Sequence, residues 1–342
     1  MAANLSGISE FFKYCLKRTA SSCWILFKLM IPVSIVIRLI QEFGILPYIS
    51  GALEPVMGIV GLPAETAIVW LSAMVVNIYG GLLSLFSIYP SLNEPLTHSQ
   101  LTILLTMVIV AHNFPVEVGI AKKTGVKFWI MFLIRFLGAI ALGAILNGIY
   151  SLTGTLQETV EMPEFLVPGH LGWGEWALNE LKNYGLIIAV IFALVMFVRL
   201  LEVIGFMKFI NKLFLPLLGW LGISERMLPL TVIGMTMGLA YGGGLIVDEG
   251  RKEGMKPKDI FFAMTLMGLF HSIFEDTILI ISAGAHWTGV ILVRAIFAFA
   301  VTYAFVLITK RFDDKKFARI FMTKEFRKRH IKNDEQPAET KG

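Results

Sequence analysis

Hydrophobic residues of the 342-residue chain gather into long runs that are separated by short polar stretches. About 20 consecutive apolar residues cross the hydrocarbon core of a bilayer as a helix, so runs of this length predict membrane-spanning helices. Six such runs cover residues 24–44, 99–121, 127–150, 185–205, 259–282 and 288–309. Two more, residues 66–89 and 227–247, are interrupted by Tyr79-Gly80-Gly81 and by Tyr241-Gly242-Gly243-Gly244. The pattern predicts an all-α polytopic protein with six transmembrane helices and two broken segments.

The chain repeats uncommon residue types at an offset that stays between 159 and 162 residues. The first copy comprises Arg38, Pro55, Gly58, Gly61, Tyr79, Gly80, Gly81, His112, Glu117 and Arg135. The second copy comprises, in the same order, Arg199, Pro216, Gly219, Gly222, Tyr241, Gly242, Gly243, His271, Asp276 and Arg294. Matches of this kind at a nearly constant spacing indicate an internal duplication.

The composition agrees with a membrane protein: 56% of the residues are hydrophobic, 16% are charged and the mean hydropathy is +0.72. Soluble globular domains contain about 25% charged residues, so that class is excluded. The net charge of +5 lies mostly at the ends of the chain, which indicates contact with anionic lipid headgroups rather than with nucleic acid. The only cysteines, Cys15 and Cys23, support neither a disulfide framework nor a thiolate metal site.

Loop charges indicate whether the two broken segments cross the membrane or turn back within it. Cytoplasmic loops carry an excess of Lys and Arg. If both segments cross, five loop cations fall inside and six outside, whereas with two re-entrant hairpins ten fall inside and only Lys182 outside. The ten are Lys122, Lys123, Lys127, Lys208, Lys212, Arg226, Arg251, Lys252, Lys256 and Lys258. The distribution favours the hairpins, and both arrangements leave the two termini cytoplasmic.

With two hairpins, the halves of the chain cross the membrane in opposite directions and form inverted repeats. A glycine cluster at each hairpin tip would let the chain reverse with φ values that glycine adopts at little cost. Unpaired backbone groups at that depth are tolerated only beside a protein-lined or wet cavity, so the tips are candidate walls of a site. The alternative is that these glycines pack inside ordinary spanning helices.

The repeats divide the chain into five segments. Residues 1–23 form an N-terminal amphipathic segment, with a basic interfacial helix expected over residues 8–20. The first inverted repeat covers residues 24–150 and the second covers residues 185–309. An external acidic linker, residues 151–184, joins the repeats, and residues 310–342 form a basic cytoplasmic tail.

Each half places one histidine, His112 or His271, near the middle of an apolar run. An acid, Glu117 or Asp276, follows five residues later, which is about 140° around a helix and therefore on a different face. Glu275 follows His271 by four residues and does share its face. A histidine at the same mid-membrane place in both halves favours contact with a solute, a proton or an ion. The alternative is a hydrogen bond that joins two helices.

Two of the repeated arginines are expected to pair with these acids. Arg135 and Arg294 come early in the helix that follows each acid, at depths that allow Glu117 to meet Arg135 and Asp276 to meet Arg294. An unpaired charge at a helix centre costs about 3 kcal/mol, so pairing is favoured. We interpret both as structural ion pairs between adjacent helices.

Arg38 and Arg199 lie one helix earlier in each half and are interpreted as structural too. Gln41 and Glu42 follow Arg38, and Glu202 follows Arg199, within about one helical turn. Side chains three or four residues apart on a helix are neighbours, so local pairing would neutralise both arginines.

The same residues could serve a metal, because two imidazoles and several carboxylates suit a divalent transition ion. Within one helix only His271 and Glu275 have a ligand-like spacing, and metal binding stays open. An intramembrane metalloprotease would need HExxH or an equivalent ligand set, and the segment from His271 to Glu275 has one histidine only. The sequence favours a protein that is not an enzyme and that has no cofactor. A coupling cation or a proton is the candidate bound ion.

The arrangement resembles the nucleoside-recognition, or Gate-domain, family of membrane proteins. This family includes spore maturation proteins and is distantly similar to concentrative nucleoside transporters and to the membrane part of bacterial ferrous iron transporters. The resemblance covers most of residues 30–309. It rests on Gly61-Leu62-Pro63-Ala64-Glu65, Asn77-Ile78-Tyr79-Gly80-Gly81, His112-Asn113-Phe114-Pro115-Val116-Glu117 and their second-half partners.

In nucleoside transporters of this kind, hairpin tips and one polar helix from each half enclose the solute. The resemblance therefore implies a substrate site in both halves of the chain. Its members would be Asn77, Tyr79, His112, Asn113, Glu117, Tyr241, His271, Ser272, Glu275 and Asp276.

These patterns together predict a secondary carrier of a small polar solute, nucleoside-like or an organic anion, in the inner (plasma) membrane. It would work by alternating access about a site near the middle of the bilayer. We expect a homo-oligomer with the lipid bilayer and the solute as partners. The alternatives are a transporter of a divalent metal or a lipid-linked substrate, and an accessory membrane protein that acts with a homologous partner.

Overall fold

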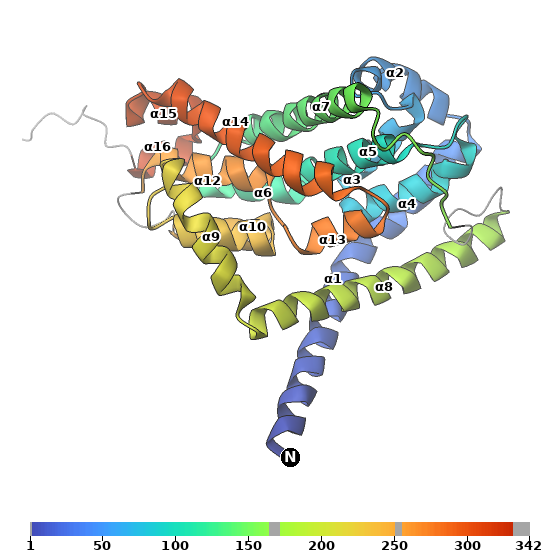
Figure 1. Cartoon of the computed structure of the whole chain (residues 1–342), viewed down its shortest axis with the longest axis horizontal. Coiled ribbons are helices and arrows are strands. Elements are labelled where there is room, and N and C mark those ends of the chain that lie inside the picture. The colour runs from blue at the N-terminus through green and yellow to red at the C-terminus, as the bar shows by residue number, and fades with distance from the viewer. Residues whose placement is uncertain (1, 164–171, 250–254, 331–342) are drawn as a thin grey trace, which may run out of the picture. The chain divides into compact units, whose positions relative to one another are not determined.

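The computed structural model describes residues 2–163, 172–249 and 255–330 of the chain (Figure 1). Every regular element in these ranges is a helix, and the two β-bridges among them, Thr97 with Thr159 and Val126 with Met322, are isolated. The all-α class predicted from the apolar runs is therefore confirmed.

Four helical segments of the described chain are long and apolar enough to cross a bilayer. They are Ser9–Glu42 of α1 (Ala2–Glu42), α7 (Phe128–Thr153), α8 (Trp173–Val203), and the π-helical turn η3 (Thr288–Val293) together with α14 (Arg294–Thr309). Two bent pairs raise the number of candidate spans to six: Tyr48–Ile59 with Ala64–Val75, bent by 103°, and His98–Val110 with Phe114–Thr124, bent by 42°. The protein is a helical membrane protein.

Two of the predicted spans are not single helices. The run over residues 99–121 divides into α5 (His98–Val110) and α6 (Phe114–Thr124), and the run over residues 259–282 divides into α12 (Pro257–Leu269) and α13 (Glu275–Ser282). At the breaks, Asn113 and Ser272 have φ values of 50° and 48°, in the left-handed region that interrupts a helix. The sequence predicted one continuous spanning helix for each run. In the structure, each run is instead divided into two helices.

The chain folds into two compact units. Unit 1 comprises Met1–Phe114, Leu137–Phe209 and Ile273–Arg294, and unit 2 comprises Pro115–Phe136, Ile210–Ser272 and Ala295–Gly342. The breaks at Asn113 and Ser272 coincide with the boundaries between these units. Each unit thus contains the first part of one broken run and the second part of the other.

In unit 1, α3 (Ala67–Val75) and α4 (Ile78–Ile88) pack against each other as a pair of short helices. The closest approach is at Gly81, where an added Cβ would lie 2.8 Å from the Cβ of Ala73. The backbone N–H of Asn113 donates to the carbonyl of Ala73 at 2.9 Å, which ties the end of α5 to this pair. α1 packs along α8, and α2 (Leu46–Ile59) packs against α3.

Unit 2 contains a second pair of short helices, α10 (Leu228–Met237) and α11 (Leu239–Glu249), which pack against each other and against α12. An added Cβ on Gly242 would collide with the backbone of Gly234, so α10 and α11 touch backbone to backbone. At their junction, an added Cβ on Gly238 would lie 3.0 Å from the hydroxyl of Ser272. Most of α9 (Phe206–Trp220) and α14 also belongs to this unit.

The order of the helices is repeated in the two halves of the chain. α3, α4 and α5 have 9, 11 and 13 residues, and α10, α11 and α12 have 10, 11 and 13. In both halves a broken run comes next and then a long helix that begins near a buried arginine. This order agrees with the duplication predicted from the sequence.

The repeated glycines have a different role from the one expected at hairpin tips. Gly80 and Gly81 lie inside α4, and Gly242 lies inside α11 with the two glycines that follow it. The chain reverses earlier, at Asn77, whose side chain accepts a hydrogen bond from Gly80 N at 3.0 Å, and at Gly238, whose φ is 103°. The expectation that the clusters themselves make the reversal is wrong, because what they supply is space for close helix contact.

Both ends of the described chain are more ordered than the sequence suggested. The N-terminal segment is continuous with the first span in the single helix α1 instead of forming a separate helix over residues 8–20. The segment after residue 310 contains α15 (Asp314–Phe321) and α16 (Lys324–His330), and α15 packs against α12 through Phe261, Phe317 and Phe321. In the predicted linker, α8 already begins at Trp173, and residues 164–171 lie outside the described ranges.

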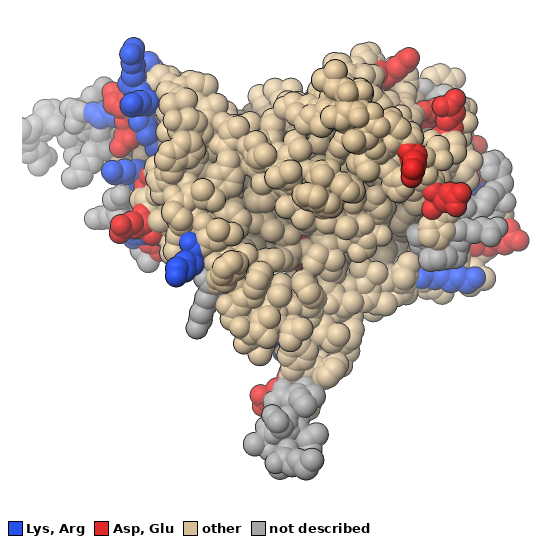
Figure 2. All heavy atoms as spheres, viewed as in Figure 1, with Lys and Arg blue, Asp and Glu red and all other residues tan. Residues whose placement is uncertain are grey.

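Charged side chains lie at the helix ends of each unit (Figure 2). In unit 2, Lys and Arg gather over α15 and α16, which carry Lys315, Lys316 and Lys324. In unit 1, acidic side chains gather near α2 and the α4 to α5 connection, where Glu54 and Glu94 are exposed. Elsewhere, the visible surface carries few charged side chains, as expected of a lipid-facing surface.

Candidate functional site

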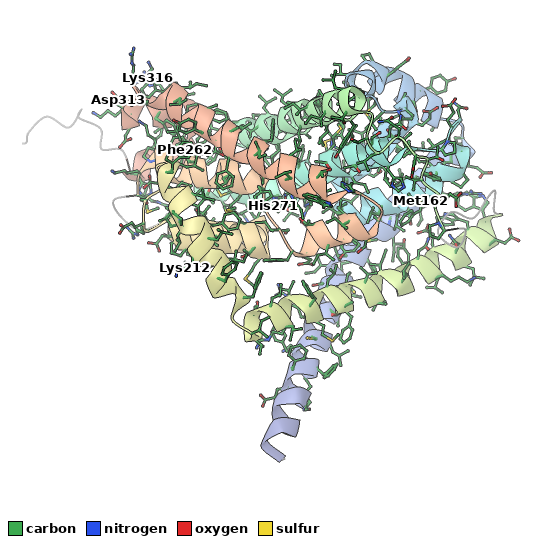
Figure 3. All side chains as sticks on the ribbon, viewed as in Figure 1. Met162, Lys212, Phe262, His271, Asp313 and Lys316 are labelled. Carbon is green, nitrogen blue, oxygen red and sulfur yellow. The ribbon has the colours of Figure 1, made fainter. Side chains whose placement is uncertain are left out.

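His271 lies directly after α12 in unit 2, where the helix ends before the break (Figure 3). Its side chain is fully buried, and its Nδ1 lies 2.7 Å from the carbonyl oxygen of Met267, one turn back along α12. A carbonyl oxygen can only accept a hydrogen bond, so Nδ1 carries a hydrogen. This fixes the ring orientation and turns Nε2 away from α12.

The Nε2 atom of His271 faces the carboxylate of Glu117, which lies in the first turn of α6. The distance from His271 Nε2 to Glu117 Oε1 is 3.3 Å, and the other carboxylate oxygen lies 2.6 Å from an Nη atom of Arg135. Arg135 is fully buried in α7, and Glu117 is nearly so. Unit 2 therefore contains a continuous chain of polar groups, Met267 O, His271, Glu117 and Arg135, inside an apolar surrounding. Glu117 and Arg135 thus lie in ion-pair contact, and the structural role expected for this pair stays a prediction.

A hydrogen bond between His271 Nε2 and Glu117 Oε1 would need one proton between them. Nδ1 already carries its hydrogen, so a hydrogen bond to Glu117 requires a second one, either on Nε2 or on the carboxyl group. The pair is then an imidazolium facing a carboxylate, or a neutral imidazole facing a carboxylic acid. Loss of that proton leaves two acceptors facing each other in a buried place, which is unfavourable. A pair of this composition is therefore suited to binding one proton.

Unit 1 contains the equivalent pair. Here the first half of the chain supplies the histidine and the second half supplies the acid. His112 follows α5 and lies close to the carbonyls of Ile109 and Val108, with its Nδ1 3.0 Å and 3.2 Å away. Its Nε2 faces the carboxylate of Asp276, in the first turn of α13, at 3.7 Å. This distance is an ion-pair contact rather than a hydrogen bond. His112 is buried, whereas Asp276 keeps 18% of its side chain exposed.

The pairing of each histidine with an acid of the other half was not predicted from the sequence. Within one half, the acid five residues after the histidine lies beyond the break, so helical spacing does not determine which histidine it meets. The duplication contained information about this pairing, because His112 corresponds to His271 and Asp276 corresponds to Glu117. One cross-half pair therefore implies the other, yet neither can be inferred without the breaks.

The remaining arginines are placed as follows. Arg199 pairs with Glu202 at 2.7 Å, as predicted, and Arg38 pairs with Glu42 at 3.2 Å. Both pairs join neighbouring turns of one helix, which supports the structural interpretation. Arg294 is fully buried at the start of α14, and its pairing with Asp276 stays a prediction.

A cavity of about 320 Å³ lies within unit 1, between α4, α8, α13 and the loop that contains Met162 (Figure 3). Tyr79 lines it from the first turn of α4. The side chain of Tyr79 is only 8% exposed, and in the described ranges its hydroxyl has no hydrogen-bond partner. Sequence reasoning missed Asn183, a buried amide of α8 that lines the same cavity, because residues 151–184 were assigned to a linker.

The other predicted site residues have local roles. Asn77 caps α4, and Asn113 and Ser272 form the two helix breaks. Glu275 begins α13 in unit 1, next to Asp276, and both carboxylates act electrostatically on Tyr79. Tyr241 lies in α11, and its side chain is outside the described part of the chain.

Each His–acid pair offers one imidazole and one carboxylate. Imidazole and carboxylate are also ligands of divalent metals, so metal binding stays a prediction. What both pairs share is an oriented imidazole that faces a carboxylate at the junction of a broken helix, which suits proton binding.

Comparison with known proteins gives the class. Residues 23–127 match the family model of the Gate domain, described as nucleoside recognition, so the predicted resemblance to this family is confirmed over that region. The chain is therefore a helical membrane protein that is similar to the Gate domain over these residues.

Over 287 residues it is 25% identical to the uncharacterized membrane protein YvoD of Bacillus subtilis (strain 168), which covers 82% of this chain and 89% of YvoD. No solved structure matches the chain.

Proposed function

We propose that the protein is a secondary transporter of a small polar solute, in which the two His–acid pairs bind the coupling proton and help to bind the solute. The observation that carries this proposal is the duplicated pair: His271 with Glu117 in unit 2 and His112 with Asp276 in unit 1. Ionisable groups within membrane segments are costly and usually mark a pathway for a solute, an ion or a proton. Two such pairs at corresponding places in a duplicated chain are poorly explained by packing alone.

The helix breaks support the same function. Secondary transporters place their sites where helices are interrupted near the middle of the bilayer. Both histidines stand at such interruptions, beside Asn113 and Ser272. A helix that is interrupted beside its polar residue can bend at that point, while the apolar helices on either side stay intact.

The short helix pairs support re-entrant hairpins. Helices of 9 to 11 residues are about 15 Å long, half the thickness of the hydrocarbon core. α3 with α4, and α10 with α11, would therefore enter the membrane and turn back. Together with the loop charges, this supports our proposal that the two halves are inverted repeats with both termini cytoplasmic.

The cavity in unit 1 suggests the size of the solute. Its volume of about 320 Å³ is at the lower end of the range for small-molecule sites, about 300–1,000 Å³. Tyr79 offers an aromatic ring and a hydroxyl with no partner in the described chain. Together with the Gate-domain match, this favours a nucleoside-like solute or a small organic anion.

A ligand screen tests the site. Purified protein is heated with nucleosides, organic anions, lipids and divalent metals, and its unfolding temperature is compared with that of His112→Ala, His271→Ala and Tyr79→Phe. We expect one solute class to stabilise the wild type and to lose this effect in the histidine variants, with a smaller loss in Tyr79→Phe. Tyr48→Phe, at an exposed tyrosine of α2, is the control. Stabilisation that persists in both histidine variants would reject the site.

Cysteine labelling tests the topology. In a chain whose buried Cys15 and Cys23 are replaced by alanine, Asn93→Cys is expected to react with an impermeant maleimide from outside. Lys324→Cys is expected to react only after the membrane is opened, because the basic tail is cytoplasmic in this topology. If Asn93→Cys were labelled only from the cytoplasmic side, the hairpin arrangement would be wrong.

A further inference from the structure

We propose that a pocket between α6 and α16 in unit 2 binds a phosphate group. The pocket has a volume of about 630 Å³ and receives Lys122 and Lys123 from the last turn of α6 and Arg329 from the last turn of α16. It is separate from the His–acid pair of unit 2, and the transport proposal does not depend on it. We refer to it as the basic pocket.

The basic pocket is held in place by backbone contacts between the α15–α16 connection and the loop after α6. Thr323 N donates to Gly125 O at 2.7 Å, and Lys127 N donates to Phe321 O at 2.9 Å. Gly125 has a φ of 108°, and an added Cβ there would lie 2.6 Å from the ring of Phe326. The tail segment therefore fits closely on this loop, and the three cationic side chains come from elements that are fixed to each other.

The basic pocket has more cationic than anionic lining residues in the described ranges. Among these residues, Glu325 is the one acid, and with the three cations it gives a net charge of +2. The pKa of Glu325 is lowered by its own backbone N–H, followed by Thr323 and the charges of Lys122 and Lys328, so it is already ionised. Lysines in the last turn of α6 also offset the helix dipole, but this does not explain Arg329, which comes from another helix.

A phosphate group fits these features better than a carboxylate does. Its several oxygens can be shared by three cationic donors, and arginine binds phosphate through two parallel hydrogen bonds. Thr323 also lines the pocket: its oxygen accepts from Phe326 N at 3.3 Å, and its hydroxyl is hydrogen-bonded to the Glu325 carboxylate. Val247 and Phe326 provide an apolar side to the pocket.

The phosphate could belong to an anionic phospholipid or to a soluble molecule, since both present the same group. α6 is the second half of the bent candidate span His98–Thr124, so its last turn lies where a spanning helix meets the headgroups. Basic pockets at the cytoplasmic ends of helices bind phospholipid headgroups by this chemistry.

Binding measurements on the full chain test the proposal and separate the two sources. Protein in a detergent with an uncharged headgroup is titrated with inorganic phosphate and pyrophosphate in one arm. In the other arm, protein in nanodiscs of phosphatidylcholine is compared with nanodiscs that also contain phosphatidylglycerol or cardiolipin, with lipid retention read by native mass spectrometry. Lys122→Gln/Lys123→Gln and Arg329→Gln are compared with the control Lys315→Gln/Lys316→Gln, a neighbouring lysine pair of α15 outside the pocket.

We expect one arm to show binding that is about tenfold weaker in each pocket variant and unchanged in the control. All substituted side chains are exposed, so the unfolding temperature without ligand should stay constant. Binding only in the lipid arm would identify a headgroup site, and binding of free phosphate would identify a soluble ligand; both support the pocket. Equal binding by wild type and pocket variants, or no binding in either arm, would overturn the proposal.

Discussion

Replacing Glu117 by glutamine is expected to lower the free energy of unfolding by about 3–5 kcal/mol, because it leaves a buried charge without its partner. Arg135 is fully buried and pairs with Glu117 at 2.6 Å. An arginine cannot lose its proton inside a protein, so the charge persists after the carboxylate is gone. His271 loses its acceptor in the same variant. The expected result is a large drop in the unfolding temperature of the purified protein, or a loss of folded protein from the membrane.

The reverse substitution is the matched comparison. In Arg135→Leu the remaining Glu117 can take up a proton and become neutral, so the loss should be smaller than in Glu117→Gln. In the double variant Glu117→Gln/Arg135→Leu neither charge of this ion pair is left, and part of the stability should return. If Glu117→Gln were as stable as the wild type, the ion pair would not be the structural element that its burial indicates.

Replacing Gly242 by alanine is expected to destabilise the protein by about 3 kcal/mol, because α10 and α11 are in backbone contact there. The added Cβ would meet the Cα and N of Gly234, and backbone atoms cannot rotate away as a side chain does. The two helices would have to separate, and α12 packs against the same pair. Thermal unfolding of the purified variant measures the effect.

Gly244→Ala is the control, because it lies two residues further along the same helix and an added Cβ meets nothing within 4 Å. Alanine is favoured over glycine in a helix by up to about 1 kcal/mol, so this variant should be as stable as the wild type or slightly more. If Gly242→Ala and Gly244→Ala unfolded at the same temperature, close helix packing would not be the reason for the glycine at residue 242.

The sequence was sufficient for the class of fold and for the contacts between adjacent helices. Apolar runs of spanning length predicted the long helices α7 and α14 because such a run has few stable alternatives in a bilayer. The pairs Glu117–Arg135 and Arg199–Glu202 followed from depth and from helical spacing. In each case the cause acts over one or two neighbouring helices, so the residues that matter are close in the sequence.

The polar pairs required the three-dimensional structure. His112 and Asp276 are far apart in the sequence and meet only because each broken run contributes one helix to each unit. The breaks themselves depend on left-handed φ values at Asn113 and Ser272, which neither residue type requires. The glycine clusters were recognised as special, but a glycine in a reversal and a glycine in a helix contact look the same in a sequence.

Uptake into vesicles that contain only the purified chain tests the central claim most directly. The labelled solute that gives the largest thermal stabilisation is added with and without an imposed pH gradient, to wild type and to His112→Gln and His271→Gln. Glutamine keeps a polar side chain at each place but cannot hold a transferable proton. We predict uptake that the pH gradient drives in the wild type and that both variants lose. Absence of uptake by the wild type, or uptake that ignores both the gradient and the substitutions, would contradict the account.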